Sequence, residues 1–136
     1  MKWILLFSLM FSMPVLADKL SDTKALAEQG NATAQYDLGT MYRTGKGAAQ
    51  DYKSAVKWWE LSAGKGYTDA QWALGNMYEE GRGLLQDYKM AHMWYNIAAA
   101  SGDEDAAENR SRIAKEMSPE AINQAQSLAR KWMAAH

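Results

Sequence analysis

Residues 30–65 read GNATAQYDLGTMYRTGKGAAQDYKSAVKWWELSAGK, and residues 66–101 follow as GYTDAQWALGNMYEEGRGLLQDYKMAHMWYNIAAAS. When the two stretches are aligned without a gap, 16 of their 36 positions hold the same residue. A repeat of this length is typical of a solenoid, in which each unit buries its apolar face against its neighbours. The repeat therefore predicts a recognition surface rather than a catalytic pocket.

Each copy carries the apolar spacing of two helices joined by a turn. In the first copy, apolar residues recur every three or four positions over 34–42 and again over 52–63, as on one face of a helix. Asp51 and its counterpart Asp87 precede the second helix, where a carboxylate can cap the free backbone N–H groups. The sequence thus predicts an all-α fold, a short α-solenoid of antiparallel helical hairpins.

Two pairs of repeated residues carry packing predictions. Gly39 and Gly75 lie in the middle of the first helix of each copy, where glycine costs about 1 kcal/mol relative to alanine. We therefore expect two helix backbones to approach closely at these positions. Trp58 and Trp94 recur in register on the apolar face of the second helix, and we expect both to be core anchors between units.

The repeat register extends past both ends of the pair. Ser21 is a predicted N-cap for a short helix over about 22–29, the second half of a truncated unit. After residue 101 the repeat decays, and Ser118-Pro119-Glu120 is a strong start signal for one more helix. The predicted organisation has four segments, namely a partial unit 18–29, repeats 30–65 and 66–101, and a C-terminal capping unit 102–136.

The N-terminus has the features of a secretory signal peptide. Lys2 precedes a short apolar stretch, and Val15 and Ala17 are small residues at positions −3 and −1 of a cut after residue 17. The apolar stretch is shorter than the roughly 18 residues that a membrane span needs. We expect residues 1–17 to be removed and the mature chain, 18–136, to be periplasmic or secreted without stable membrane insertion.

Composition narrows the classes of function. Removing Lys2 leaves 14 basic and 16 acidic side chains, so no concentrated basic face for nucleic acid is expected. The chain has no cysteine, and His92 and His136 are its only histidines. A structural zinc site usually takes four His or Cys ligands. We therefore expect no metal site, no cofactor and no catalytic residues.

The repeated motif resembles a known family. The residues that carry the resemblance are Ala34-Gln35, Leu38-Gly39, Met41-Tyr42, Gly45-x-Gly47, Gln50-Asp51-Tyr52, Ala55 and Trp58. This pattern resembles the Sel1-like repeat, a relative of the tetratricopeptide repeat. The resemblance implies an adaptor or partner-binding module, often found in bacterial envelopes and in host-interacting proteins. Some secreted members are disulfide-rich and have been associated with β-lactam or peptidoglycan chemistry, but this chain lacks their cysteines.

Positions at which the two copies differ are candidates for partner recognition. Tyr36, Thr40 and Arg43 form one stripe at i, i+4, i+7 spacing on the first helix of the first copy. The same geometry in the second copy carries a different set: Trp72, Asn76 and Glu79. By resemblance to related helical-hairpin repeats, these stripes would lie side by side on the concave face. Ordinary surface variation is the competing explanation.

Together these features predict a non-catalytic module that binds another periplasmic or secreted protein as an adaptor, regulator or immunity-type inhibitor. The alternative is a secreted Sel1-like enzyme that binds or hydrolyses peptidoglycan or a β-lactam. The absence of cysteine, of a usable histidine pair and of any nucleophile elbow favours the first hypothesis.

Overall fold

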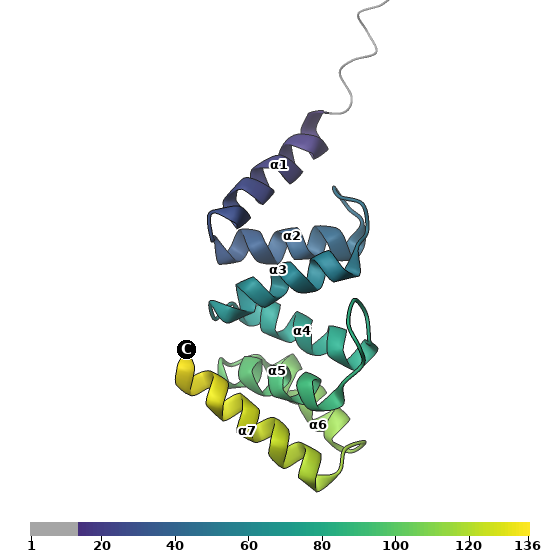
Figure 1. Ribbon diagram of the computed structural model, residues 1–136, viewed down its shortest axis with the longest axis vertical. Helices are drawn as coiled ribbons and strands as arrows, with labels where there is room; N and C mark the ends of the chain where they lie inside the picture. Colours follow the sequence, from purple (N-terminus) through teal and green to yellow (C-terminus); the bar gives the residue numbers. More distant parts are fainter. Residues whose placement is uncertain (1–13) are drawn as a thin grey trace, which may run out of the picture.

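The computed structural model describes residues 14–136, and the elements within this range are all α-helices (Figure 1). Their bounds are α1 (Pro14–Glu28), α2 (Ala32–Thr44), α3 (Tyr52–Gly64), α4 (Thr68–Glu80), α5 (Tyr88–Ala100), α6 (Glu104–Ala114) and α7 (Pro119–Ala135). Helices α2 and α3 form one antiparallel hairpin and α4 and α5 the next, and successive hairpins stack along the long axis. The predicted all-α solenoid is confirmed.

The predicted caps are present at the helix ends. The carboxylates of Asp51 and Asp87 each accept hydrogen bonds from two backbone N–H groups in the first turn of α3 and α5. Between one repeat and the next, Gly30, Gly66 and Gly102 adopt φ values of 94°, 87° and 99°, a left-handed conformation that favours glycine. These caps and glycines recur every 36 residues, so the ends of the helices recur with the same period.

Helix α1 differs from its prediction. It already covers Pro14–Glu28 within the described residues, so Ser21 lies inside the helix and is not its N-cap. The predicted cleavage point after Ala17 falls within α1, and the apolar stretch at 3–13 lies outside the described residues.

The last helix begins as predicted but packs in an unexpected place. The Ser118 hydroxyl accepts a hydrogen bond from the Ala121 backbone N–H at 3.1 Å, and Pro119 occupies the first turn. Instead of forming a hairpin with α6, α7 folds back and packs along α5 (Figure 1). Ala125 and Ala129 are fully buried in this contact.

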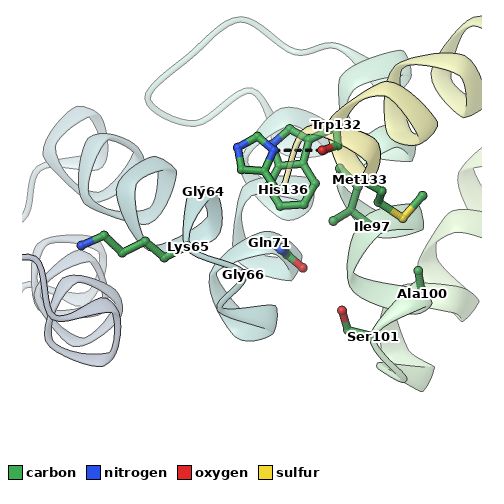
Figure 2. A pocket seen from close by; sticks show the side chains of 10 residues that line it. All are labelled: Gly64, Lys65, Gly66, Gln71, Ile97, Ala100, Ser101, Trp132, Met133 and His136. Carbon is green, nitrogen blue, oxygen red and sulfur yellow. Dashed lines mark hydrogen bonds between the residues drawn. The ribbon is translucent and has the colours of Figure 1, made fainter.

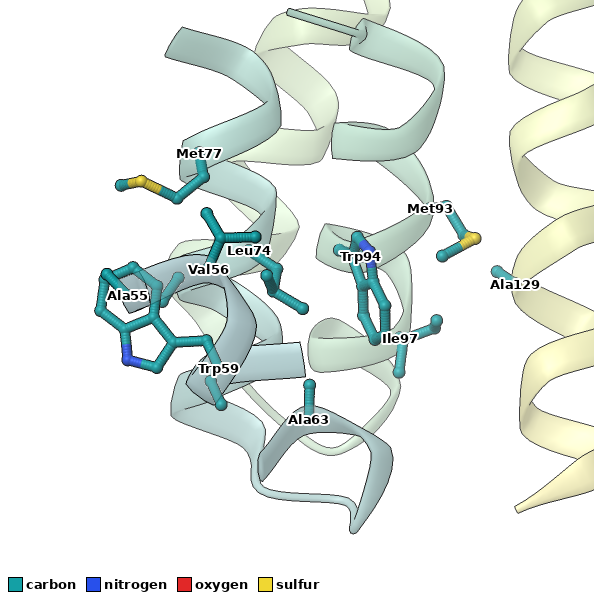
Figure 3. Packing of buried hydrophobic residues seen from close by; sticks show 12 residues of the cluster. Ala55, Val56, Trp59, Ala63, Leu74, Met77, Met93, Trp94, Ile97 and Ala129 are labelled. Atoms are coloured by element: carbon teal, nitrogen blue, oxygen red, sulfur yellow. The ribbon is translucent and has the colours of Figure 1, made fainter. Parts of the chain in front are cut away.

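The main core lies between α3, α4 and α5 and is closed by α7 (Figure 3). Trp94 is 8% exposed and sits in this core, where its ring meets Trp132 of α7 edge-on at 5.6 Å. Its counterpart Trp58 is only partly buried and packs against the smaller cluster of α1 and α2. The fully buried tryptophan of the first repeat is the neighbouring Trp59. The prediction for Trp94 is therefore confirmed, whereas Trp58 is a partly exposed contact.

The two mid-helix glycines face aromatic rings rather than a second backbone. A Cβ atom added at Gly39 would lie 2.5 Å from the ring of Trp59, and one added at Gly75 would overlap the ring of Tyr95 in the same way. The expectation of two closely approaching helix backbones was wrong, because a flat ring from the second helix fills the space above each glycine. In both repeats a glycine of the first helix contacts an aromatic ring of the second helix, but the ring is a tryptophan in the first repeat and a tyrosine in the second.

Candidate interaction surface

The first predicted stripe lies on the surface of α2 and is partly packed. Tyr36 is half-buried, with its ring centroid 5.1 Å from Tyr67 at the start of α4 and 6.3 Å from Trp59. Burial raises the pKa of the Tyr36 phenol above its ordinary value. The Thr40 hydroxyl donates to the Tyr36 carbonyl at 3.1 Å, and Arg43 is exposed. Tyr36 is thus held by α3 and by the start of the next repeat, whereas the side chain of Arg43 remains exposed.

A hollow of about 410 Å³ opens beside this stripe. Tyr36 and Thr40 line it from α2, Lys19 contributes from α1, and Lys46 contributes from the loop between α2 and α3. Asp37 is the acidic residue among those that line the hollow. The lining thus holds two basic side chains, Lys19 and Lys46, and one acidic side chain.

The second stripe is bound more tightly into the protein. Trp72 packs against the cluster formed by α5 and α6, and its indole N–H is buried without a partner among the described residues. The hydroxyl of Tyr95 lies 2.6 Å from the Asn76 amide oxygen and 3.0 Å from a Glu79 carboxylate oxygen. Burial and the charge of Glu79 raise the pKa of the Tyr95 phenol, so it stays protonated.

An ion pair links the same network to the next helix. Arg112 of α6 approaches the Glu79 carboxylate at 2.6 Å. Glu79 therefore holds α4 to both α5 and α6, and its side chain is only 15% exposed. Asn76 and Glu79 act first as parts of the scaffold, whereas Thr40 and Arg43 remain available at the surface.

Sequence reasoning missed Tyr95 and Arg112 as partners of the second stripe. One feature of the sequence could have indicated these contacts: the same aligned position holds Trp59 in the first repeat and Tyr95 in the second. Tyrosine brings a hydroxyl that needs hydrogen-bond partners when buried. The change in the stripe from Thr40 and Arg43 to Asn76 and Glu79 supplies those partners. Part of the variation between copies thus reflects internal hydrogen bonding.

Within residues 14–136, no grouping of three or more His, Cys, Asp or Glu side chains is arranged to hold a metal ion. No helix in the same part of the chain is both long and apolar enough to span a membrane.

The family model of the Sel1 repeat matches residues 32–67 and 68–103. The chain belongs to the Sel1 repeat family. The matched segments keep the 36-residue period of the sequence repeat and begin two residues later than residues 30 and 66. Sel1 repeats generally mediate protein–protein interactions, and the Sel1 fold is typically a non-catalytic scaffold.

Solved structures with the same fold include two that share more than a quarter of their aligned residues with this chain. A protective antigen of uropathogenic Escherichia coli superposes with a TM-score of 0.82 at 28% identity, over 85% of this chain and 25% of the antigen. A Sel1 repeat protein from Oxalobacter formigenes gives a TM-score of 0.67 at 34% identity, over 69% of this chain and 39% of that protein. The Sel1 chain thus spans only a quarter to two fifths of these relatives.

A third structure, the cysteine-rich protein B of Helicobacter pylori, has a TM-score of 0.62 at 24% identity, over 65% of this chain and 67% of that protein. At this identity the likeness concerns the fold alone. No curated protein matches the sequence significantly.

Proposed function

We propose that this Sel1 repeat protein is an exported, non-catalytic module that binds another protein of the bacterial envelope or the secreted fraction. Its role would be that of an adaptor, a regulator or an immunity-type inhibitor. The observation that carries the proposal is the hollow beside α2, lined by Tyr36 and Thr40 and bordered by basic side chains. Tyr and Arg are among the residue types most enriched at binding hot spots.

The charge around the hollow indicates what the partner presents. Lys19 and Lys46 line it, the exposed Arg43 lies nearby on α2, and Asp37 is the acidic side chain in its lining. In the second repeat, by contrast, Glu79 is paired with Arg112 and Glu80 with Arg82. We therefore propose that a partner places an acidic segment against the first repeat. Complementary charges of this kind contribute mainly to association rate and specificity.

The test is a crosslinking pull-down from the envelope fraction with the wild-type protein and with Arg43→Glu. Arg43 is exposed, so the variant should fold normally and lose the partner, with affinity reduced by about 2 kcal/mol or more if Arg43 is a hot spot. Lys57→Glu is the matched control, because it makes the same charge reversal at an exposed position of α3. Equal recovery of the partner with both variants would move the interface to another surface.

Tyr36→Ala tests the same surface but also removes ring contacts with Trp59 and Tyr67. Its affinity should therefore be compared with its helicity, measured by circular dichroism on the same sample. Export is tested separately by N-terminal sequencing of the protein from the envelope fraction, which should begin at Asp18. An intact Met1 chain recovered from the cytosol would contradict the proposed export.

A further inference from the structure

A second recessed surface lies beside the turns that join one repeat to the next, where α7 ends (Figure 2). It is a groove of about 350 Å³ between the α3–α4 turn, the end of α5 and the last turns of α7. Ile97 and the ring of Trp132 supply apolar walls. The groove shares no lining residue with the hollow beside α2.

Gln71 brings an unpartnered acceptor to this groove. The side chain is 1% exposed, and its Nε2 donates to the Ala63 carbonyl at 3.3 Å. Its amide oxygen has no hydrogen-bond partner among the described residues, and in Figure 2 it points toward the space between Gly66 and Ser101. A buried acceptor without a partner destabilises the folded protein. A ligand that offers an N–H at this point would remove that destabilisation.

The first repeat supplies an internal comparison. Gln35, the counterpart of Gln71, donates to the Ala27 carbonyl at 3.1 Å and also leaves its amide oxygen unpartnered. The buried glutamine is therefore a property of the repeat. At Gln71, however, α7 adds Trp132 as a wall and encloses the adjacent space. The groove described here is built where the capping helix meets the second repeat.

Two glycines leave room for the main chain of a ligand. A Cβ atom added at Gly64 or Gly66 would meet nothing within 4 Å. The backbone on this side of the groove is therefore open to close approach, as in other sites where glycine admits a second backbone.

Lys65 is the charged side chain of the Asp, Glu, Lys and Arg types in the lining. The Lys65 amine donates to the Gly30 carbonyl and points away from the groove in Figure 2. The His136 ring stacks on Trp132 at 4.1 Å, and its Nδ1 lies 2.9 Å from the Trp132 carbonyl. Because the Lys65 ammonium group is directed away, the groups that face the groove favour a neutral ligand that combines an N–H donor with an apolar group.

We propose that this groove binds a short, neutral segment of extended peptide from a partner protein. One large apolar side chain packs between Ile97 and Trp132, and the adjoining main-chain N–H donates to the Gln71 amide oxygen. The inference goes beyond the interface proposed on α2, because it names a second site and the chemistry of its ligand.

The probes are blocked tripeptides of the form acetyl-Ala-Xaa-Ala-amide, with leucine, phenylalanine, serine or lysine at Xaa. Binding is followed by NMR through the Trp132 indole N–H and the Gly66 backbone N–H. The leucine and phenylalanine peptides should shift both resonances with dissociation constants of roughly 1 mM, a scale expected for a short flexible ligand. The serine and lysine peptides should bind at least about tenfold more weakly. Equal binding of all four peptides, or of none, would overturn the proposal.

Gly64→Leu is the decisive variant. Gly64 is the last residue of α3 and has no positive φ, so leucine improves helix propensity while its side chain fills the groove. This variant should melt no lower than the wild type and should lose peptide binding. A stable Gly64→Leu protein that still binds the leucine peptide would overturn the assignment of the site.

Gln71→Met and Gln35→Met test the acceptor as a matched pair. Each removes one bond between adjacent repeats, but only Gln71→Met removes an acceptor from the groove. Peptide affinity should fall about tenfold in Gln71→Met and remain unchanged in Gln35→Met. Equal affinities in the two variants would show that Gln71 is purely structural. Arg43→Glu should leave peptide binding intact, so a failure of the α2 interface is distinguishable from a failure of this groove.

Discussion

At the scale of single residues, the contact between a helical glycine and an aromatic ring organises each repeat. Trp59 rests on Gly39, and its indole N–H also donates to the Tyr36 carbonyl at 3.1 Å. Tyr95 rests on Gly75 and extends its hydroxyl to Asn76 and Glu79. Because glycine has no side chain, the ring can lie directly on the first helix. This contact is an essential part of the packing between the two helices of a hairpin.

We predict that Gly75→Ala destabilises the protein by about 1–3 kcal/mol, the usual cost of overpacking a core. The added methyl group overlaps the Tyr95 ring, and this cost outweighs the gain of about 1 kcal/mol in helix propensity. The measurement is urea unfolding followed by circular dichroism. Gly64→Ala is the matched control, since its Cβ meets nothing within 4 Å, and it should be neutral or stabilising. A more stable Gly75→Ala protein would show that the ring can move aside.

His92 makes stability depend on pH. It is 3% exposed on α5, and its Nδ1 has no hydrogen-bond partner among the described residues. Burial and the positive charge of Arg110 lower the pKa of His92 below its ordinary value of 6.5. The unfolded chain therefore binds the proton more readily than the folded one, so the free energy of unfolding decreases as pH falls below about 6.5.

We predict that His92→Val, which places the residue of the first repeat at this position, flattens the decrease in stability between about pH 7 and pH 5. The check is a series of urea unfolding curves at several pH values for both proteins. Parallel curves would show that other groups cause the pH dependence.

At the scale of elements, the position of α7 follows from the chemistry of α5. Met93 and Ile97 of α5 are buried under α7, whereas their counterparts on α3 are Lys57, which is exposed, and Leu61, which is 48% exposed. The two second helices thus have different outer faces, apolar on α5 and largely polar on α3. Helix α7 covers the apolar one.

We predict that Ala129→Asp detaches α7 from α5. Ala129 is fully buried in the main core, and an unpaired carboxylate there should cost about 3 kcal/mol or more. The variant should bind the dye ANS and show altered tryptophan fluorescence, because Trp94 and Trp132 lose their contact. Gln126→Asp introduces the same charge at an exposed position of α7 and should stay within about 0.5 kcal/mol of the wild type. Similar losses in both variants would argue against the packing described for α7.

The helices themselves were predictable because caps, glycines and apolar spacing act locally. Asp51, Asp87 and Ser118 all cap the helices that their sequence positions indicate. The partner of α7 was not predicted, because a start signal says nothing about which face a helix covers. Similarly, the stripe on α2 stays a prediction as a binding surface, and the bonds of Asn76 and Glu79 depend on a tyrosine hydroxyl from another helix.

At the scale of the whole molecule, packing is uneven along the stack. Helices α3, α4, α5 and α7 share one core, while the described side chains of α1 that join a core are Ala27 and Leu20, in the small cluster next to α2. Local stability should therefore increase from α1 toward α5.

We predict that backbone amides of α1 exchange with deuterium fastest and those of α5 slowest. Fewer buried apolar contacts mean a smaller free energy of local opening, and this applies to α1 regardless of its helix propensity. Hydrogen exchange read by mass spectrometry or NMR measures the gradient directly. Uniform protection across the helices would instead indicate that all units open together.

The ring-on-glycine contact also has a consequence for the design of longer proteins from this one. Residues 110 and 111 are Arg and Ser where the two repeats have Leu and Gly, so α6 lacks the flat recess on which a ring from the following helix could rest. Without that recess α7 packs on α5 instead of forming a hairpin with α6, and the regular stacking of hairpins stops there. Adding a third repeat would therefore require more than a copied sequence period, since the recess and its matching ring must be introduced together and the apolar face of α5 must be made polar.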